Sequence, residues 1–181
     1  MTENETVLFG SYYQSDPARK EPIEWIVIEK TDTYATLISK SILCEKAFDE
    51  ETAAGWTWRN STLRSWLNSE FLNEAFSASE QRALLPDEDG CPVFILNSDE
   101  AGRLMTEEQR AAVMTGSARD NGIFRDDCWW VCSRGYSDFD TVIVKADGRL
   151  NPDAYDRFSS QGCGVRPCVR ITLSAVPPEM P

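Results

Sequence analysis

The sequence contains no histidine. This absence excludes the Ser-His-Asp triad, the Cys-His dyad, histidine-ligated zinc and general-base catalysis by imidazole. The chain also lacks an apolar run long enough to cross a bilayer, and residues 1–10 carry no basic start followed by an apolar stretch, as a signal peptide would. We therefore expect a cytoplasmic protein that does not insert into membranes. Display on the cell surface, through a partner or a longer precursor, stays open as an alternative.

Basic residues are scarce: 18 lysines and arginines stand against 30 aspartates and glutamates, for a net charge of −12. Nucleic acids and anionic lipid surfaces are bound by clustered lysine and arginine side chains, so we expect no nucleic-acid partner. The 181 residues, 41% of them hydrophobic, are enough for one domain with its own core. We expect that domain to cover residues 1–175, with a flexible C-terminal tail over residues 176–181.

The hydrophobic periodicity predicts an α+β fold. Two segments rich in β-branched and aromatic residues, 23–28 and 34–38, flank a polar turn and predict a β-hairpin. Apolar residues at helical spacing predict a helix over residues 61–76. Further strands are expected at residues 6–9, 91–96, 128–132, 141–145 and 165–173, short helices at 77–85, 98–105 and 106–114, and loops at 10–21 and 42–58. Helices thus occupy the middle of a chain whose terminal strand regions are expected to pair.

Short motifs follow one another along the chain. They are FGSYYQ at residues 9–14, IEWIV at 23–27, TLRSWLN at 62–68 with FLN at 71–73 and AF at 75–76, and WWVCS at 129–133 with VRPCV at 165–169. Together they resemble the FGSYPQ, PIEW, TLRxWLN, WWLRSPG and VRPAL pattern of a bacterial domain family of unknown function. The resemblance covers residues 9–173. The chain departs from it at Cys132, Arg134 and Cys168, where that family has arginine, proline and a small apolar residue.

The end of the chain also resembles formylglycine-generating enzymes and other proteins with the C-type-lectin fold. This resemblance implies a single C-type-lectin-like domain with paired terminal strands, helices in the middle and late loops displayed on one face. It also implies an alternative function, a thiol- or copper-dependent oxidative enzyme of formylglycine-generating type. Such an enzyme would use two of the four late cysteines.

Those late cysteines are Cys128, Cys132, Cys163 and Cys168, and we expect free thiols because no export signal is visible. Two alternatives stay open: a disulfide from Cys128 or Cys132 to Cys163 or Cys168, and a metal site. On a strand, Cys128 and Cys132 would lie about 13 Å apart, at ~3.3 Å per residue. That spacing argues against a shared ion, so we expect neither a metal nor a cofactor.

Two late segments, 133–140 and 151–160, are dense in Tyr, Ser, Asn, Asp and Arg. This composition is typical of recognition surfaces, because tyrosine gives rigid contact area and small polar residues give adaptable hydrogen bonds. Asn151-Pro-Asp153 is interpreted as a turn rather than a calcium site. The segments are predicted to form two loops that bind an unidentified protein or small molecule. The predicted ligand-binding residues are Ser133, Arg134, Tyr136, Asp138, Phe139, Asp140, Asn151, Asp153, Tyr155, Asp156, Arg157 and Phe158.

The composition of residues 131–160 is biased: they include one lysine and no Glu, Gln, Met or Trp. Average usage would give about six residues of these five types. An asparagine codon cannot reach any of the five by changes at its adenines, and diversity-generating retroelements randomise adenines in genes for C-type-lectin-fold proteins. Strands and turns without helix formers would leave a similar bias. The hypothesis is a non-enzymatic ligand-binding domain, the variable protein of such a retroelement; a structural or docking domain remains a further alternative.

Overall fold

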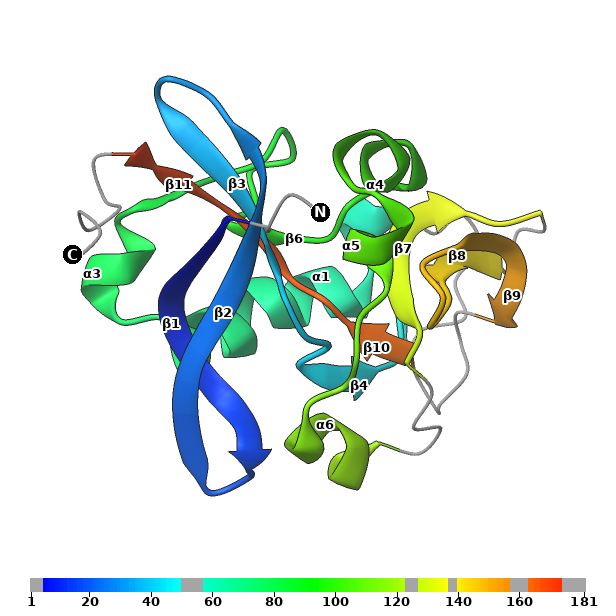
Figure 1. Cartoon of the computed structure of the whole chain (residues 1–181), viewed down its shortest axis with the longest axis horizontal. Coiled ribbons are helices and arrows are strands. Elements are labelled where there is room, and N and C mark those ends of the chain that lie inside the picture. The colour runs from blue at the N-terminus through cyan, green and yellow to red at the C-terminus, as the bar shows by residue number, and fades with distance from the viewer. Residues whose placement is uncertain (1–4, 50–56, 123–126, 137–139, 157–162, 174–181) are drawn as a thin grey trace.

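The computed structural model describes residues 5–49, 57–122, 127–136, 140–156 and 163–173. They form a mixed α+β chain with two sheets, and every described helix lies between residues 58 and 121 (Figure 1). The predicted α+β class and the central position of the helices are therefore confirmed for the described residues.

The first sheet contains both ends of the described chain. Its order is β1-β2-β3-β11-β5, with β6 also paired to β11. Antiparallel pairing of β11 with β3 joins the two terminal strand regions, as expected. The strands are β1 (Thr6–Asp16), β2 (Arg19–Lys30), β3 (Tyr34–Ser39), β5 (Leu84–Leu85), β6 (Val93–Phe94) and β11 (Cys168–Thr172).

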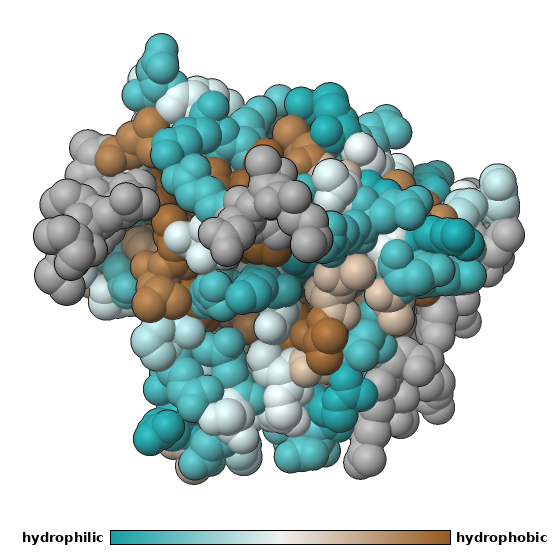
Figure 2. Space-filling view, in the orientation of Figure 1, coloured by the Kyte–Doolittle hydropathy of each residue, from teal (hydrophilic) through white to brown (hydrophobic). Residues whose placement is uncertain are grey.

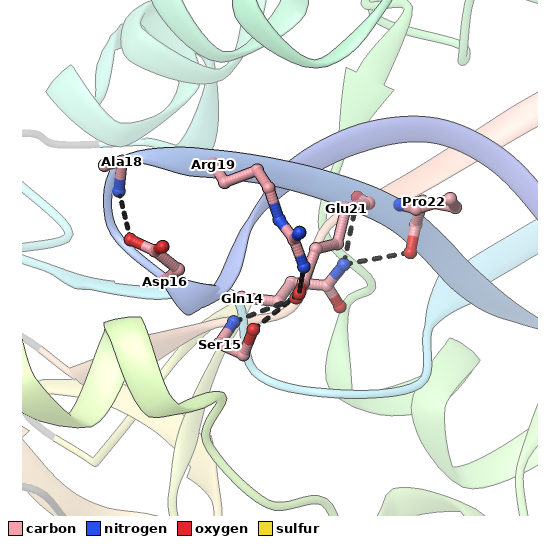
Figure 3. A network of polar contacts seen from close by, with 7 residues as sticks. All are labelled: Gln14, Ser15, Asp16, Ala18, Arg19, Glu21 and Pro22. Carbon is pink, nitrogen blue, oxygen red and sulfur yellow. Dashed lines mark hydrogen bonds and ion pairs between the residues drawn. The ribbon is translucent and has the colours of Figure 1, made fainter.

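The hairpin of β1 and β2 corrects the loop expected over residues 10–21. Both strands run into this segment and turn at its middle, where side chains bond to backbone (Figure 3). Gln14 Nε2 donates to the carbonyls of Glu21 and Pro22, and the Ser15 N–H donates to the Glu21 carboxylate. Asp16 accepts from the Ala18 N–H in the turn itself. Polar side chains thus hold a hairpin tip that hydrophobic alternation alone does not indicate.

The second sheet has the order β4-β10-β7-β8-β9. Its β4 lies in the expected loop 42–58, and the expected single strand 165–173 is split between the sheets, as β10 here and β11 in the first. The split falls at Arg166-Pro167, because proline cannot donate a ladder hydrogen bond. The strands are β4 (Cys44–Lys46), β7 (Trp129–Arg134), β8 (Asp140–Val144), β9 (Leu150–Asp156) and β10 (Cys163–Val165).

The predicted long helix forms one helical run. Ser61 caps its start by accepting from the Arg64 N–H, and Leu63, Leu67 and Phe71 are buried, which confirms their place in the core. The run packs on the first sheet, with the rings of Tyr12 and Phe71 5.0 Å apart. Its parts are α1 (Thr62–Trp66), the π-helical turn η2 (Leu67–Phe71) and α2 (Leu72–Ala75), after the 3-10 turn η1 (Trp58–Asn60).

Short helices complete the middle of the chain. Three of these helices begin within a residue or two of their predicted starts. Capping boxes open them at Ser77, Asn97 and Thr106. The helices end earlier than expected, and the last of them has no counterpart among the elements expected from the sequence. They are α3 (Ala78–Gln81), α4 (Ser98–Leu104), α5 (Glu107–Arg110) and α6 (Gly116–Asn121).

Three of the sequence motifs, FGSYYQ, IEWIV and AF, contact one another where β1 packs on the end of the helical run. Trp25 Nε1 donates to the Phe9 carbonyl at 2.7 Å, and the ring of Phe76 stacks near both Phe9 and Trp25. Gly10 has φ +66°, and a Cβ there would lie 2.7 Å from the Phe76 ring. The Gly10 N–H donates to Glu80 at 3.0 Å. These motifs therefore build the scaffold.

Acid should weaken this junction through Glu80. Burial alone would raise the pKa of Glu80, but hydrogen bonds from the Ser77 hydroxyl, the Ser77 N–H and the Gly10 N–H outweigh it and lower the pKa. Because the folded-state pKa lies below the unfolded one, the stabilisation is present at neutral pH and is lost as pH falls through the folded pKa. We expect Glu80→Gln to cost about 1 kcal/mol at pH 7, the usual value of a cap, and less at pH 3.

Urea denaturation at pH 7 and pH 3 measures this difference. Glu88→Gln is the control, because Glu88 is exposed; its cost should be near zero at both pH values. An equal cost of Glu80→Gln at the two pH values would contradict the proposed role of the Glu80 carboxylate.

Candidate functional site

The structure brings together the two late segments predicted to bind a ligand. Strand β8 pairs antiparallel with both β7 and β9, with Asp140 opposite Asp156 and Thr141 opposite Tyr155. The Gly135 N–H donates to the Asp140 carbonyl at 2.9 Å. Backbone positions 133–136, 140 and 151–156 therefore lie side by side in and next to β7, β8 and β9, the last three strands of the second sheet, and we call them the β7–β9 edge. Figure 2 shows mainly hydrophilic residues over this right-hand part of the molecule.

The described part of the second segment, residues 151–156, is a strand where a loop was predicted. Residues 151–156 continue the β8–β9 pairing, so the turn interpretation of Asn151-Pro-Asp153 is wrong. Proline is tolerated there because β9 ends the sheet, and an edge strand has a side without ladder hydrogen bonds. The chain instead returns from β8 to β9 at residues 145–149, where Gly148 has φ +85°.

Tyr136 is a large exposed side chain of the β7–β9 edge. It follows the end of β7 and is 78% exposed, next to the exposed Arg134. The backbone beneath it is tightly packed: a Cβ on Gly135 would lie 2.5 Å from the Pro152 carbonyl oxygen and 2.6 Å from Asp140 Cβ. The Tyr136 N–H also donates to the Pro152 carbonyl. A fixed backbone thus presents an aromatic ring to solvent, as a binding surface requires.

The other predicted binding residues differ in their surroundings. Asp140 and Asn151 are half-buried. The Ser133 hydroxyl accepts from the N–H and the hydroxyl of Ser98, so it holds the start of α4 in place. For Asp153, Tyr155 and Asp156 the structure describes the backbone in β9. Asp138, Phe139, Arg157 and Phe158 lie outside the described residues.

Among the late cysteines, the structure brings Cys128 and Cys163 into contact. Their Sγ atoms lie 2.8 Å apart, and the residues are 7% and 1% exposed. Burial raises the pKa of the Cys163 thiol, and the neighbouring Cys128 adds to the rise. Cys132 instead directs its Sγ to the Ile95 carbonyl at 3.5 Å, and burial raises its pKa to about 12. Within the described residues, no three His, Cys, Asp or Glu side chains form a metal-binding group.

Sequence reasoning missed the surface cavities. One of them, about 270 Å³, is lined by Trp66, and the Lys46 ammonium lies 4.5 Å from the centre of the Trp66 ring. The helical periodicity of the sequence did not indicate this cavity, because Trp66 lies on the same apolar face of the helical run as the buried residues. An acidic cavity of about 140 Å³ adjoins Cys132. Its Asp87 and Glu100 carboxylates accept from nearby backbone N–H groups, so they stabilise the local turns.

Comparison with known proteins gives one match. Residues 33–94, about a third of the chain, match a family model described as a domain of unknown function (DUF6273). The matched stretch runs from just before β3 to β6 and includes the whole helical run, so it ends before the β7–β9 edge. No curated protein and no solved structure matches the chain. None of the described helices has the length and apolar character needed to cross a membrane.

Proposed function

We propose that the chain is a non-enzymatic ligand-binding module with a C-type-lectin-like fold, and that the β7–β9 edge is its ligand surface. The observation that carries the proposal is the ring of Tyr136, which is 78% exposed on a closely packed backbone. Large aromatic side chains usually lie inside proteins and are enriched where partners bind. Arg134 beside it supplies a charged, planar group that is also common at binding surfaces.

The division between scaffold and surface supports this function. The motif residues Trp25, Phe76, Trp129 and Arg166 are fully or nearly fully buried. Their burial places these residues in the scaffold rather than on the candidate ligand surface. Of the three departures from the pattern that the chain resembles, Arg134 lies in the candidate ligand surface, whereas Cys132 and Cys168 lie outside it.

We further propose that residues 131–160 are the variable region of a diversity-generating retroelement. The segment contains five aspartates and no glutamate, and Asp140, Asp153 and Asp156 lie in strands. Strands disfavour aspartate more than glutamate, and they favour tryptophan, which is absent here. Strand formation therefore does not account for the bias. Mutation of asparagine codons at their adenines accounts for the bias, because such mutation can yield aspartate but neither glutamate nor tryptophan.

Sequencing the DNA around the gene tests this proposal. We expect a reverse transcriptase gene nearby and a second copy of the coding region for residues 131–160. The two copies should differ only where the second copy has adenine. Absence of both the reverse transcriptase and the copy would show that the chain is not a retroelement's variable protein.

The geometry of the thiol pair does not favour the oxidative enzyme. Neither Cys128 nor Cys163 lines any of the cavities described above, and the raised pKa of Cys163 disfavours the reactive thiolate. Two thiolates bound to one metal, each at about 2.3 Å, would lie about 3.8 Å apart at a tetrahedral angle. The observed 2.8 Å is too short for a bridging ion. The two residues are instead free thiols in direct contact, with their sulfur atoms farther apart than the about 2.05 Å of a disulfide bond.

A further inference from the structure

The contact between Cys128 and Cys163 follows from how β7 and β10 are paired. The strands are parallel neighbours, with Gly164 opposite Trp129, and the Gly164 N–H donates to the Cys128 carbonyl at 3.1 Å. A Cβ on Gly164 would lie 2.3 Å from that same carbonyl oxygen, so glycine permits the close approach. The Sγ atoms are 2.8 Å apart, well inside the about 3.5–4.0 Å at which unbonded heavy atoms usually rest.

We propose that Cys128 and Cys163 are a site of oxidative cross-linking and form an intrachain disulfide. The bond itself stands on this geometry. Its effect on ligand binding rests on the proposed function. The bond would close a loop of the chain that begins at Cys128, just before β7, and ends at Cys163, just after residues 157–162. All of the β7–β9 edge lies inside that loop.

Two other described cysteines, Cys132 and Cys91, have different partners. The Cys132 sulfur is directed to a backbone carbonyl, and the Cys91 sulfur accepts from Arg64 Nε at 2.9 Å. Cys128 and Cys163 are directed toward each other. The structure thus selects one of the pairings that the sequence left open.

The reaction needs an oxidant, and a small-molecule disulfide such as oxidised glutathione supplies it. One cysteine thiolate attacks the small disulfide, forms a mixed disulfide and releases one glutathione thiolate. The second cysteine thiolate then attacks the protein sulfur of that mixed disulfide and releases the second glutathione. The protein loses two hydrogens and two electrons, and the oxidant is reduced to two thiols. Because both thiols are buried, the bond should form while the chain folds.

A disulfide here would tie both ends of the candidate ligand surface to the scaffold at one point. Substitutions within the loop could then alter the surface while its base stays fixed. A variable ligand surface requires such a fixed base, because the fold has to tolerate many different sequences within the loop. The bond would also restrict the unfolded chain, since the closed loop spans residues 128–163.

Refolding the full chain in a glutathione redox buffer tests the proposal. We expect a mass lower by two hydrogens, four cysteines open to alkylation in denaturant, and one linked peptide pair that contains Cys128 and Cys163. The melting temperature should exceed that of the reduced protein by about 10 °C. Cys128→Ser should abolish the link and the shift, whereas Cys132→Ser, four residues further along the chain in β7, should retain both.

Six alkylatable cysteines after refolding, or a link through another cysteine, would overturn the proposal. The mass and the peptide map of the unmodified chain decide this even if Cys128→Ser fails to fold. The result is also separable from the proposed function. A Cys128–Cys163 link without a retroelement near the gene would support the disulfide and overturn the variable surface.

Discussion

Replacing Gly148 with alanine should destabilise the protein by about 2–5 kcal/mol. Gly148 has φ +85°, which costs a residue with a side chain about 1–2 kcal/mol. A Cβ there would also lie 2.0 Å from the Glu107 carbonyl oxygen, and overpacking of this kind adds about 1–3 kcal/mol. The Gly148 carbonyl accepts from Arg110 Nε at 2.8 Å, so the same change pushes the β8–β9 turn away from α5.

Gly90 provides a matched control for this prediction. It has φ +80°, but nothing lies within 4 Å of the position that a Cβ would take there. Gly90→Ala should therefore lower the free energy of unfolding only by the cost of a positive φ for a residue with a side chain, about 1–2 kcal/mol. Urea unfolding of both variants measures the difference. Equal losses would show that the β8–β9 turn does not pack on α5 as described.

Replacing Arg166 with methionine should cost about 3–5 kcal/mol. Arg166 is fully buried between the two sheets, where Nε donates to the Ser39 carbonyl and Nη1 donates to the carbonyls of Gln109 and Arg110. Its guanidinium also lies 5.2 Å from the ring of Trp129. Methionine fills similar space but leaves these buried acceptors without their donor. Burial lowers the pKa of Arg166 to about 10, so the side chain stays charged at neutral pH.

Arg170→Met is the comparison for Arg166. Arg170 lies in β11, half-buried over the ring of Tyr34 at 4.7 Å, and its loss should cost less than about 1 kcal/mol. Thermal and urea unfolding at pH 7 measure both variants. A loss for Arg166→Met no larger than that for Arg170→Met would contradict the role of Arg166 in joining the sheets.

Local periodicity predicted the elements whose signal lies within a short stretch. The hairpin of β2 and β3 and the helical run from Thr62 to Ala75 show alternation or helical spacing of apolar residues. The three residues of β4 are too few for such a pattern. They become a strand by pairing with β10, more than 100 residues away, and that partner cannot be seen locally.

The sequence indicated which segments to consider as a ligand surface but not how they are arranged. Composition indicated residues 133–140 and 151–160, and the pairing of β8 with β7 and β9 shows that their described parts lie side by side. Composition also could not show that the Ser133 hydroxyl bonds to Ser98, since that contact depends on α4. For the cysteines, spacing left several pairings open, and the parallel contact of β10 with β7 favours one.

Sequencing this gene and its flanking DNA in a panel of isolates tests the central claim most directly. We predict that alleles differ at exposed positions of the β7–β9 edge, Arg134 and Tyr136 first, at codons that match adenines in a nearby copy. Trp130, Val131 and Ile143, which are buried within or beside the same segment, should stay constant. Substitutions spread evenly over buried and exposed positions, or confined to residues outside 131–160, would contradict a ligand surface at this edge.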